Sequence, residues 1–245
     1  MDVRERAARF VVGVVLAAAG LTPHPHPRPA TAQEAAAPGT VPGLPHAGRW
    51  EKEVAALERE ELAADRVGGV CFVGSSNIRL WSSLADDFPG WHVARRGVGG
   101  SQLHELVPVT LRLVGHSRPG VIVVSAGIND IHAGRSAEDV ASAFTDFVAT
   151  VRRALPRTTI VFLAIAPSFA RWHERDEQAR ANALVREIVA TGDRLAYVDA
   201  ARAYLRPDGL PAAECFVADG LHPTPVGYAR RAAVLRPLLA PFLAP

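Results

Sequence analysis

The sequence lacks the patterns that mark metal-binding and nucleic-acid-binding proteins. It has only two cysteines in 245 residues, and no Cys/His cluster has the spacing of zinc ligands. Lys and Arg number 27 against 25 Asp and Glu, and this small excess falls within residues 1–32. Nucleic-acid binding would require basic residues clustered on one face, whereas here Arg is interleaved with Glu and Asp. We therefore expect no metal, no cofactor and no nucleic-acid partner.

Long apolar runs are also scarce, and the one that stands out is Phe10–Leu21. Arginines precede this run, and the small residues Ala30-Thr31-Ala32 follow it. This order is typical of a secretory signal peptide, and the run is too short to span a bilayer comfortably. We expect residues 1–32 to be a signal peptide and the mature protein to be secreted or periplasmic, without a stable membrane span. An uncleaved amino-terminal anchor is the alternative.

The remaining chain is expected to hold a linker and one domain. Residues 33–49 are rich in Ala, Pro and Gly and predict a flexible linker. Residues 50–245 show no repeat and no second domain boundary, which predicts a single domain. Cys71 and Cys215 could form a disulfide in an exported protein. Cys71 lies inside an apolar run, where a free cysteine behaves as a small hydrophobe, so we expect two free thiols.

Apolar runs alternate with amphipathic segments along this domain. The expected strands are residues 70–73, 92–94, 121–124, 159–165 and 195–199, and the expected helices are residues 50–66, 102–114, 137–155, 173–190 and 225–239. Val121–Val124 contains only β-branched residues, as does a strand buried on both faces of a parallel sheet. The alternation predicts an α/β fold with one parallel sheet of about five strands between two helical layers.

The first expected strand ends in Gly74-Ser75-Ser76. Parallel α/β proteins bind ligands outside the carboxyl ends of their strands, and helix amides beside a serine at such a turn stabilise negative charge. One hypothesis is therefore that a serine here is an exposed nucleophile. The other is that both serines only cap the following helix, as serine commonly does.

Three later loops also carry polar or conformationally special residues. The Gly-rich loop 97–100 forms either a simple tight turn or a turn whose backbone amide closely approaches a substrate oxygen. Asn129 and Asp130 follow the third strand, where they either form a turn or present a side-chain amide over the sheet edge. Asp219 and His222 are three residues apart in a turn, where they are either solvated or paired so that the carboxylate orients the imidazole.

In order and residue type, these blocks resemble the SGNH family of GDSL-type esterases and lipases. The resemblance covers about residues 67–240 and includes an intact Gly-x-Asn-Asp block, which ends at Asp130, and an intact Asp-x-x-His block, which ends at His222. It implies a flavodoxin-like, three-layer α/β/α hydrolase fold. The same features look like a bacterial branch related to platelet-activating-factor acetylhydrolases and lysophospholipase-like proteins.

The resemblance also implies a role for each matching residue. Ser76 would be the nucleophile, His222 the general base, and Asp219 the residue that orients His222. The backbone N–H groups of Ser76 and Gly100 and the side-chain amide of Asn129 would form the oxyanion hole. Asp130 would fix the Asn129 loop and take no part in the reaction.

Two positions depart from the family pattern. Ser75 replaces the Asp of Gly-Asp-Ser, which is not a member of the triad, and Arg95 stands where an Asn often opens the Gly-rich block. By its chemistry Ser75 competes with Ser76 as nucleophile, but the block position favours Ser76.

The expected activity is that of an exported serine esterase, which hydrolyses short-chain acyl or acetyl esters of carbohydrates or lipids through an acyl-enzyme on Ser76. A non-catalytic carbohydrate- or partner-binding module on the same fold is the alternative. Four aromatic residues would line an acyl pocket, stack on sugar rings or pack in the core: Trp81, Phe169, Trp172 and Phe216. The sequence leaves the natural substrate and the oligomeric state open.

Overall fold

The computed structural model describes residues 47–64 and 67–242. The predicted signal peptide and residues 33–46 of the predicted linker lie outside the described residues. The strands are β1 Val70–Gly74, β2 Val93–Gly97, β3 Val121–Ser125, β4 Thr159–Leu163 and β5 Leu195–Val198. The α-helices are α1 Ala47–Leu62, α2 Ser76–Arg79, α3 Leu84–Asp87, α4 Leu103–Leu106, α5 Thr110–Val114, α6 Ile128–His132, α7 Ala137–Ala154, α8 Arg175–Thr191 and α9 Pro225–Leu239.

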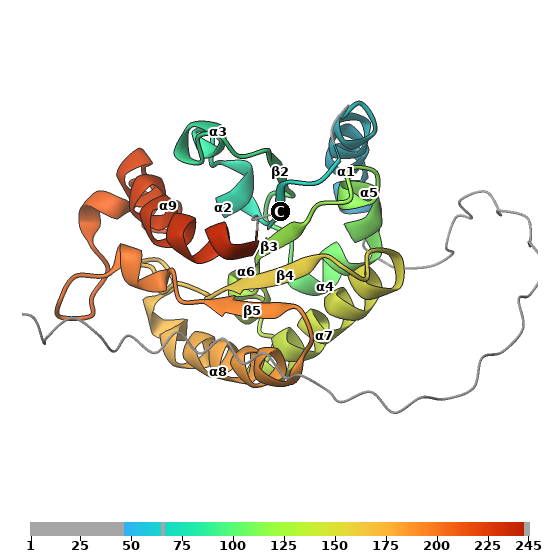
Figure 1. The fold of residues 1–245 in the computed structure, drawn as a ribbon. Helices are drawn as coiled ribbons and strands as arrows, with labels where there is room; N and C mark the ends of the chain where they lie inside the picture. The colour runs from blue at the N-terminus through green and yellow to red at the C-terminus, as the bar shows by residue number, and fades with distance from the viewer. Residues whose placement is uncertain (1–46, 65–66, 243–245) are drawn as a thin grey trace, which may run out of the picture. The chain divides into compact units, whose positions relative to one another are not determined.

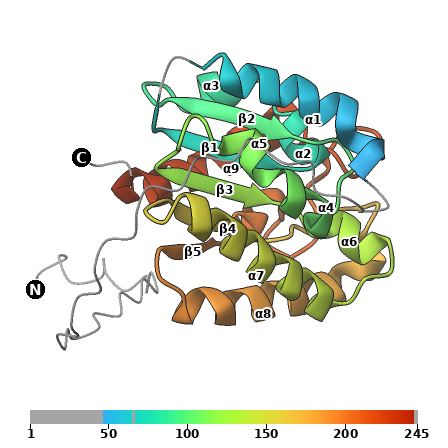
Figure 2. The same cartoon turned by 90° about the vertical axis from the view of Figure 1, so that its right-hand side faces the viewer.

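The five strands form one parallel sheet in the order β2-β1-β3-β4-β5 (Figure 2). This is the flavodoxin-like order, in which the direction of winding reverses between β1 and β3. Gly74 at the end of β1 pairs with Gly97 of β2 and with Ser125 of β3. The loops that follow these three strands therefore start level with one another at one edge of the sheet, and the α/β fold expected from the sequence is confirmed.

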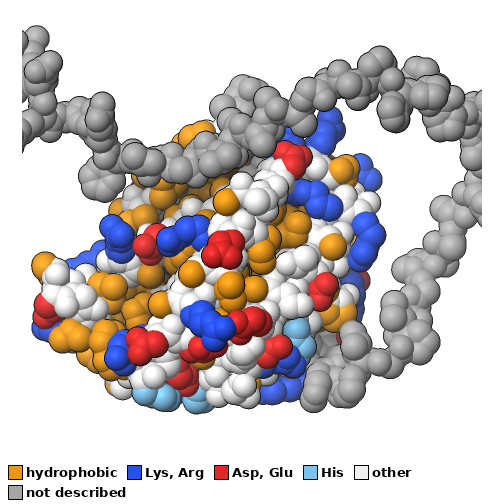
Figure 3. Space-filling model, turned by 90° about the horizontal axis from the view of Figure 1, so that it is seen from below, with side chains coloured by type: hydrophobic (Ala, Val, Ile, Leu, Met, Phe, Trp, Pro, Cys, Tyr) orange, Lys and Arg blue, Asp and Glu red, His pale blue; other side chains and the backbone are white. Residues whose placement is uncertain are grey.

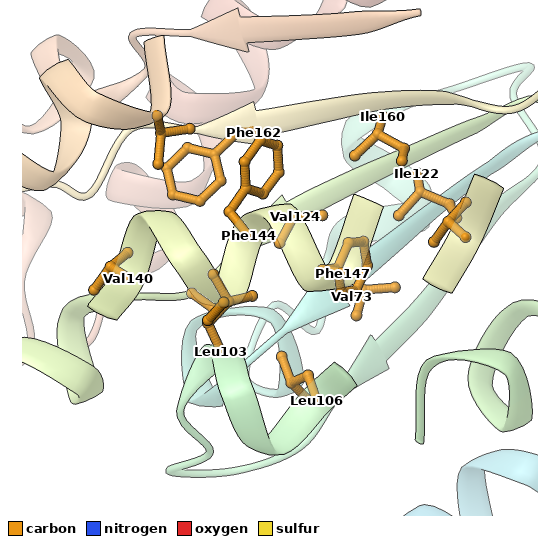
Figure 4. Close-up of a cluster of buried hydrophobic side chains, with 14 of the residues drawn as sticks. Val73, Leu103, Leu106, Ile122, Val124, Val140, Phe144, Phe147, Ile160 and Phe162 are labelled. Atoms are coloured by element: carbon orange, nitrogen blue, oxygen red, sulfur yellow. The ribbon is translucent and has the colours of Figure 1, made fainter. Parts of the chain in front are cut away.

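Alternate residues of the buried strands face two different helical layers. On one face, strand residues such as Val73, Ile122 and Phe162 pack against α4 and α7, with Phe144 edge-on to Phe162 at 5.0 Å (Figure 4). On the other face, Phe72 and its neighbours pack against α2, α3 and α9. Figure 1 shows α7 and α8 on the opposite side of the sheet from α9. Because both faces are covered, the central strands are apolar except at Ser125 and Thr159, which lie at strand ends.

β2 is longer than the sequence predicted, because a charged residue continues it. The expected strand ended at residue 94, but the structure extends it to Gly97. Arg96 is buried with a relative exposure of 6%, and its Nη2 donates to the equally buried Glu61 of α1 at 3.0 Å. The second Glu61 oxygen accepts from the Ser117 amide at 2.7 Å. A paired and hydrogen-bonded charge is tolerated inside a strand, and here it ties α1 to the sheet.

Two other expectations need correction. Helix α1 begins at Ala47, inside the predicted linker 33–49, since alanine and arginine are strong helix formers and a single Gly48 close to the helix end does not stop the helix. The single helix expected over residues 102–114 is divided into α4, a 3₁₀ turn at Val107–Val109 and α5. Pro108 in the middle explains the break, because proline provides no amide hydrogen.

Charges and thiols in the described part of the chain follow the expected pattern. On the face seen in Figure 3, Lys/Arg and Asp/Glu side chains are intermingled, and Arg180 of α8 pairs with Glu138 and Glu177. Cys71 and Cys215 are both buried and free. Among the described helices, none is long and apolar enough to cross a bilayer.

Candidate active site

Ser76 lies at the turn where β1 passes into α2. Ser75 occupies the N-cap position and is 2% exposed, and its side chain makes no capping hydrogen bond, so the capping role considered for this residue is not seen. Ser76 is the first residue of α2 and is half-buried. A Cβ on Gly74 would lie only 2.2 Å from the Ser125 carbonyl oxygen, so the close approach of β1 and β3 at this turn requires glycine.

A continuous line of hydrogen bonds runs from Ser76 to Asp219. The Ser76 Oγ lies 2.9 Å from Nε2 of His222, and Nδ1 of the same ring lies 2.6 Å from Oδ2 of Asp219. The two ends of this line are far apart in the sequence, since 146 positions separate Ser76 from His222. With Nδ1–H donated to the carboxylate, Nε2 is the unprotonated nitrogen that can accept the serine proton.

Local contacts hold the Asp219–His222 turn in place. Oδ1 of Asp219 accepts from the Leu221 and His222 amides at 2.8 and 2.9 Å. Burial acts to raise the pKa of Asp219, but the hydrogen bonds from His222 and Leu221 outweigh it and lower the pKa to about 2. Gly220 has φ +66°, where glycine is favoured. Asp219 is therefore a carboxylate throughout the neutral and mildly acidic pH range.

The next residues begin helix α9 and so fix where the turn ends. Thr224 caps the helix by accepting from the Gly227 amide at 3.2 Å, and Pro225 occupies its first turn, as helix-start statistics favour. The Tyr228 hydroxyl donates to the Asn77 carbonyl oxygen at 3.0 Å. Helix α9 thus connects the His222 turn directly to the helix that carries Ser76.

The Gly-rich loop that follows β2 contacts both the end of β1 and Asn129. The Val98 amide donates to the Gly74 carbonyl oxygen at 2.8 Å, which attaches the loop to the end of β1. Gly100 has φ +74°, in the left-handed region. Nδ2 of Asn129 donates to the carbonyl oxygen of Ser101 at 3.0 Å. An amide nitrogen carries two hydrogens, so the second Asn129 N–H remains for another acceptor.

Asp130 lies behind Asn129 and is completely buried. Both of its carboxylate oxygens accept from the Leu103 amide, at 3.0 and 2.9 Å. Burial raises the pKa of Asp130 despite these hydrogen bonds and the nearby His104. The structure therefore places Asp130 as a link between α6 and α4, away from the Ser76–His222 line of hydrogen bonds.

The four aromatic residues considered for a substrate pocket fall into two groups. Trp81 is fully buried and stacks on Tyr228 at 5.0 Å, so it belongs to the core. Phe169 is 47% exposed and lies edge-on to Phe216 at 5.7 Å. The amide that follows it, of Ala170, donates to the Gly220 carbonyl oxygen at 3.0 Å, so Phe169 stands beside the Asp219–His222 turn. Trp172 is half-buried and packs against the Arg175 guanidinium.

The sequence did not predict the contacts by which helices α4 and α9 support the site. Tyr228, Arg231 and the Leu103 amide all lie in helices whose patterns reveal only amphipathic packing. The described residues contain no group of three or more His, Cys, Asp or Glu side chains arranged to hold a metal ion.

Known proteins share both the sequence pattern and the fold. The GDSL-like Lipase/Acylhydrolase family matches residues 64–230. Platelet-activating factor acetylhydrolase IB subunit alpha1 of Pongo abelii is 29% identical over 220 residues, which covers 86% of this chain and 91% of that protein. The Bos taurus protein of the same name is 28% identical over 85% of this chain and 90% of its own length.

Solved structures agree on the fold. A GDSL-like lipase from Bacteroides thetaiotaomicron superposes with a TM-score of 0.61 at 18% identity, over 80% of this chain and 98% of that chain. A Streptococcus pneumoniae protein named after platelet activating factor gives a TM-score of 0.71 at 19% identity, over 78% of this chain and 93% of that chain. The chain belongs to the GDSL-like lipase/acylhydrolase family and is a carboxylic ester hydrolase.

Proposed function

We propose that the protein is an exported serine esterase that works through an acyl-enzyme on Ser76. The observation that carries this proposal is the unbroken line from the Ser76 Oγ through the His222 ring to Asp219, with distances of 2.9 and 2.6 Å. A non-catalytic binding module has no use for such an arrangement, and membership of a hydrolase family favours catalysis over binding alone.

The proposed reaction has two halves. Ser76 Oγ attacks the ester carbonyl carbon while His222 Nε2 takes the hydroxyl proton, and the same proton then passes to the departing alcohol. Water next attacks the acyl-serine, and His222 again moves the proton, so that the carboxylic acid is released and Ser76 is restored. Asp219 stays ionised throughout and stabilises the imidazolium that forms in each half.

Three N–H groups are proposed to stabilise the oxyanion of each tetrahedral intermediate. They are the Ser76 amide at the start of α2, the Gly100 amide, and the Asn129 N–H that is not used by Ser101. Such donors act mainly on charge that develops in the transition state, and losing one typically costs about 2.7–4 kcal/mol of barrier.

The proposed substrates are short-chain acyl or acetyl esters of carbohydrates or lipids. The relatives in Pongo abelii and Bos taurus are named as acetylhydrolases, which supports a small acyl group. The exposed Phe169 beside the His222 turn offers an apolar or stacking surface for the rest of the substrate. Export rests on the amino-terminal pattern of residues 1–32.

The test compares Ser76→Ala with Ser75→Ala on p-nitrophenyl acetate and butyrate. Ser76→Ala should reduce kcat/KM by about 10³- to 10⁶-fold, because the nucleophile is removed. Ser75→Ala should retain most activity, because Ser75 is buried and the hydrogen bond of His222 Nε2 goes to Ser76. Equal activity of Ser76→Ala and wild type would disprove the nucleophile assignment. Acetylated glycans and lysophospholipids then identify the natural class of ester.

A further inference from the structure

Arg231 of helix α9 carries a buried positive charge that no described carboxylate neutralises. Its side chain is 3% exposed, and Nη2 donates to the Ser125 hydroxyl at 2.9 Å. Within the part of the chain that the structure describes, Nε and Nη1 have no hydrogen-bond partner. Arginine remains protonated in proteins, and a buried charge without a partner is strongly destabilising. A compensating group is therefore expected near these two nitrogens.

Neighbouring side chains compensate only in part. The guanidinium carbon lies 5.6 Å from the Trp81 ring centre and 5.7 Å from that of Tyr204, within the range of cation–π attraction. Tyr204 and Cys215 are acids that could supply a negative charge, but burial raises the pKa of both, despite the opposing effect of nearby arginines. Both groups therefore stay neutral near pH 7.

Arg231 lines a small cavity beside the Ser76 turn. Arg231, Tyr204, Ser125 and Asn77 line it, and its volume is ≈ 20 Å³. A single water-sized particle needs about 10–15 Å³ by this measure, so the space suits one small particle. The Asn77 Oδ1 also lacks a partner, and the buried Tyr204 hydroxyl has only the nearby Arg231 guanidinium, which acts to lower its pKa. Buried polar groups normally have hydrogen-bond partners, and the residues that carry these unpaired atoms all line one space beside the Ser76 turn.

We propose that this cavity is a binding site for one small monovalent anion. Arg231 Nε–H and Nη1–H and the Tyr204 O–H would donate to it, and rotation of the Asn77 amide would present Nδ2–H instead of Oδ1. Charge-assisted hydrogen bonds of this kind are the strongest that a guanidinium makes. The anion is a dissolved halide such as chloride or bromide, because a space of ≈ 20 Å³ suits one small particle and not the several heavy atoms of a carboxylate.

Thermal unfolding at constant ionic strength tests this proposal. Wild-type protein is compared in sodium chloride, bromide, acetate and gluconate, of which acetate and gluconate are both too large for the cavity. At about ten times its Kd, a bound anion should raise Tm by about 3 °C relative to gluconate. The rise should occur in chloride and bromide but not in acetate, and a rise in acetate alone would contradict a halide site. The same Tm in all four salts would overturn the proposal.

Two arginines of the same helix provide a matched pair of variants. Arg231→Met should abolish the difference between salts, whereas Arg236→Met, which alters an exposed residue of α9, should retain it. Tyr204→Phe, which removes only the hydroxyl, should reduce it. A difference of wild-type size in Arg231→Met would place the anion elsewhere and overturn the proposal.

Crystals of wild-type protein grown in bromide cover the case in which Arg231→Met does not fold. An anomalous bromine peak within hydrogen-bond distance of Arg231 Nε or Nη1 supports the site, and bromide found only on the surface contradicts it. The Ser76→Ala protein should show the same salt response as wild type. The anion site and the proposed esterase mechanism can therefore fail independently.

Discussion

The Asp219–His222 turn and the Asn129–Asp130 turn lie at the same edge of the sheet but are held by different contacts. The Asp219 side chain is 48% exposed, and its partners lie within three residues of it. Asp130 is completely buried and accepts from Leu103, 27 positions away. The base side of the site is therefore built locally at the surface, whereas the oxyanion side is part of the tertiary packing. Substitutions on the His222 side should therefore reduce mainly activity, whereas substitutions on the Asn129–Asp130 side should reduce both activity and stability.

The largest effect on activity is expected from His222→Gln. This change removes the proton acceptor, so kcat/KM should fall by about 10³-fold or more. Stability should change by about 1 kcal/mol or less, because the lost hydrogen bonds, a local one to Asp219 and a long-range one to Ser76, are made by a partly exposed side chain. Ester hydrolysis and urea unfolding measure the two quantities. His116→Gln is the matched control, since His116 is an exposed residue before β3, at the opposite end of the sheet. A large loss of stability in His222→Gln would contradict the proposed difference between the two sides of the site.

Most of the fold could be predicted from the sequence, because the central strands are buried on both faces. Val121–Val124 is apolar and β-branched at every position, and this pattern predicts a strand that is buried on both faces of the sheet. The bounds of α9 were predicted correctly at Pro225–Leu239, since a capping threonine and a first-turn proline mark its start. The place of Ser76 and Asn129 also followed from the sequence, because loops after neighbouring parallel strands meet at one edge.

The contacts between distant residues could not be predicted. Arg96 pairs with Glu61 across 35 positions, and Arg231 reaches Ser125 across 106. Each arginine lies in a segment whose local pattern suggests only an exposed charge. Burial of a charge depends on a partner supplied by another element, and the spacing within one element holds no information about that partner. For this reason the predicted end of β2, at residue 94, was wrong.

Asp130→Ala should reduce both activity and stability. It leaves the buried Leu103 amide without an acceptor, and hydrogen bonds to charged groups contribute about 1.5–3 kcal/mol. Tm should fall by about 2–4 °C for each kcal/mol lost. Displacement of Asn129 should reduce kcat by up to about 10²-fold. Calorimetry and kinetics test the two effects. Asp146→Ala, on the exposed face of α7, controls for the loss of a carboxylate. Full stability with reduced activity would contradict the structural role.

The smallest expected effect is a difference in how the Asp130 and Asp219 carboxylates change the stability of the protein as the pH falls. Burial raises the pKa of Asp130, so the folded state binds this proton more tightly than the unfolded state, whose Asp pKa is about 3.9. As pH falls through the raised pKa towards about 3.9, Asp130 should therefore make a growing contribution to stability. Asp219 has the opposite sign: its pKa of about 2 means that its contribution is complete above about 3.9 and is lost only as pH falls towards 2.

Urea unfolding of wild type, Asp130→Asn and Asp219→Asn between about pH 7 and pH 3 measures both contributions. Relative to Asp130→Asn, wild type should gain stability as the pH falls towards about 4, by about 1.4 kcal/mol for each unit by which the pKa is raised. Relative to Asp219→Asn, wild type should lose stability only below about pH 4, and by less than about 1 kcal/mol because solvent screens the half-exposed carboxylate. Parallel curves for all three proteins would show that the two sides of the site share the same electrostatic environment.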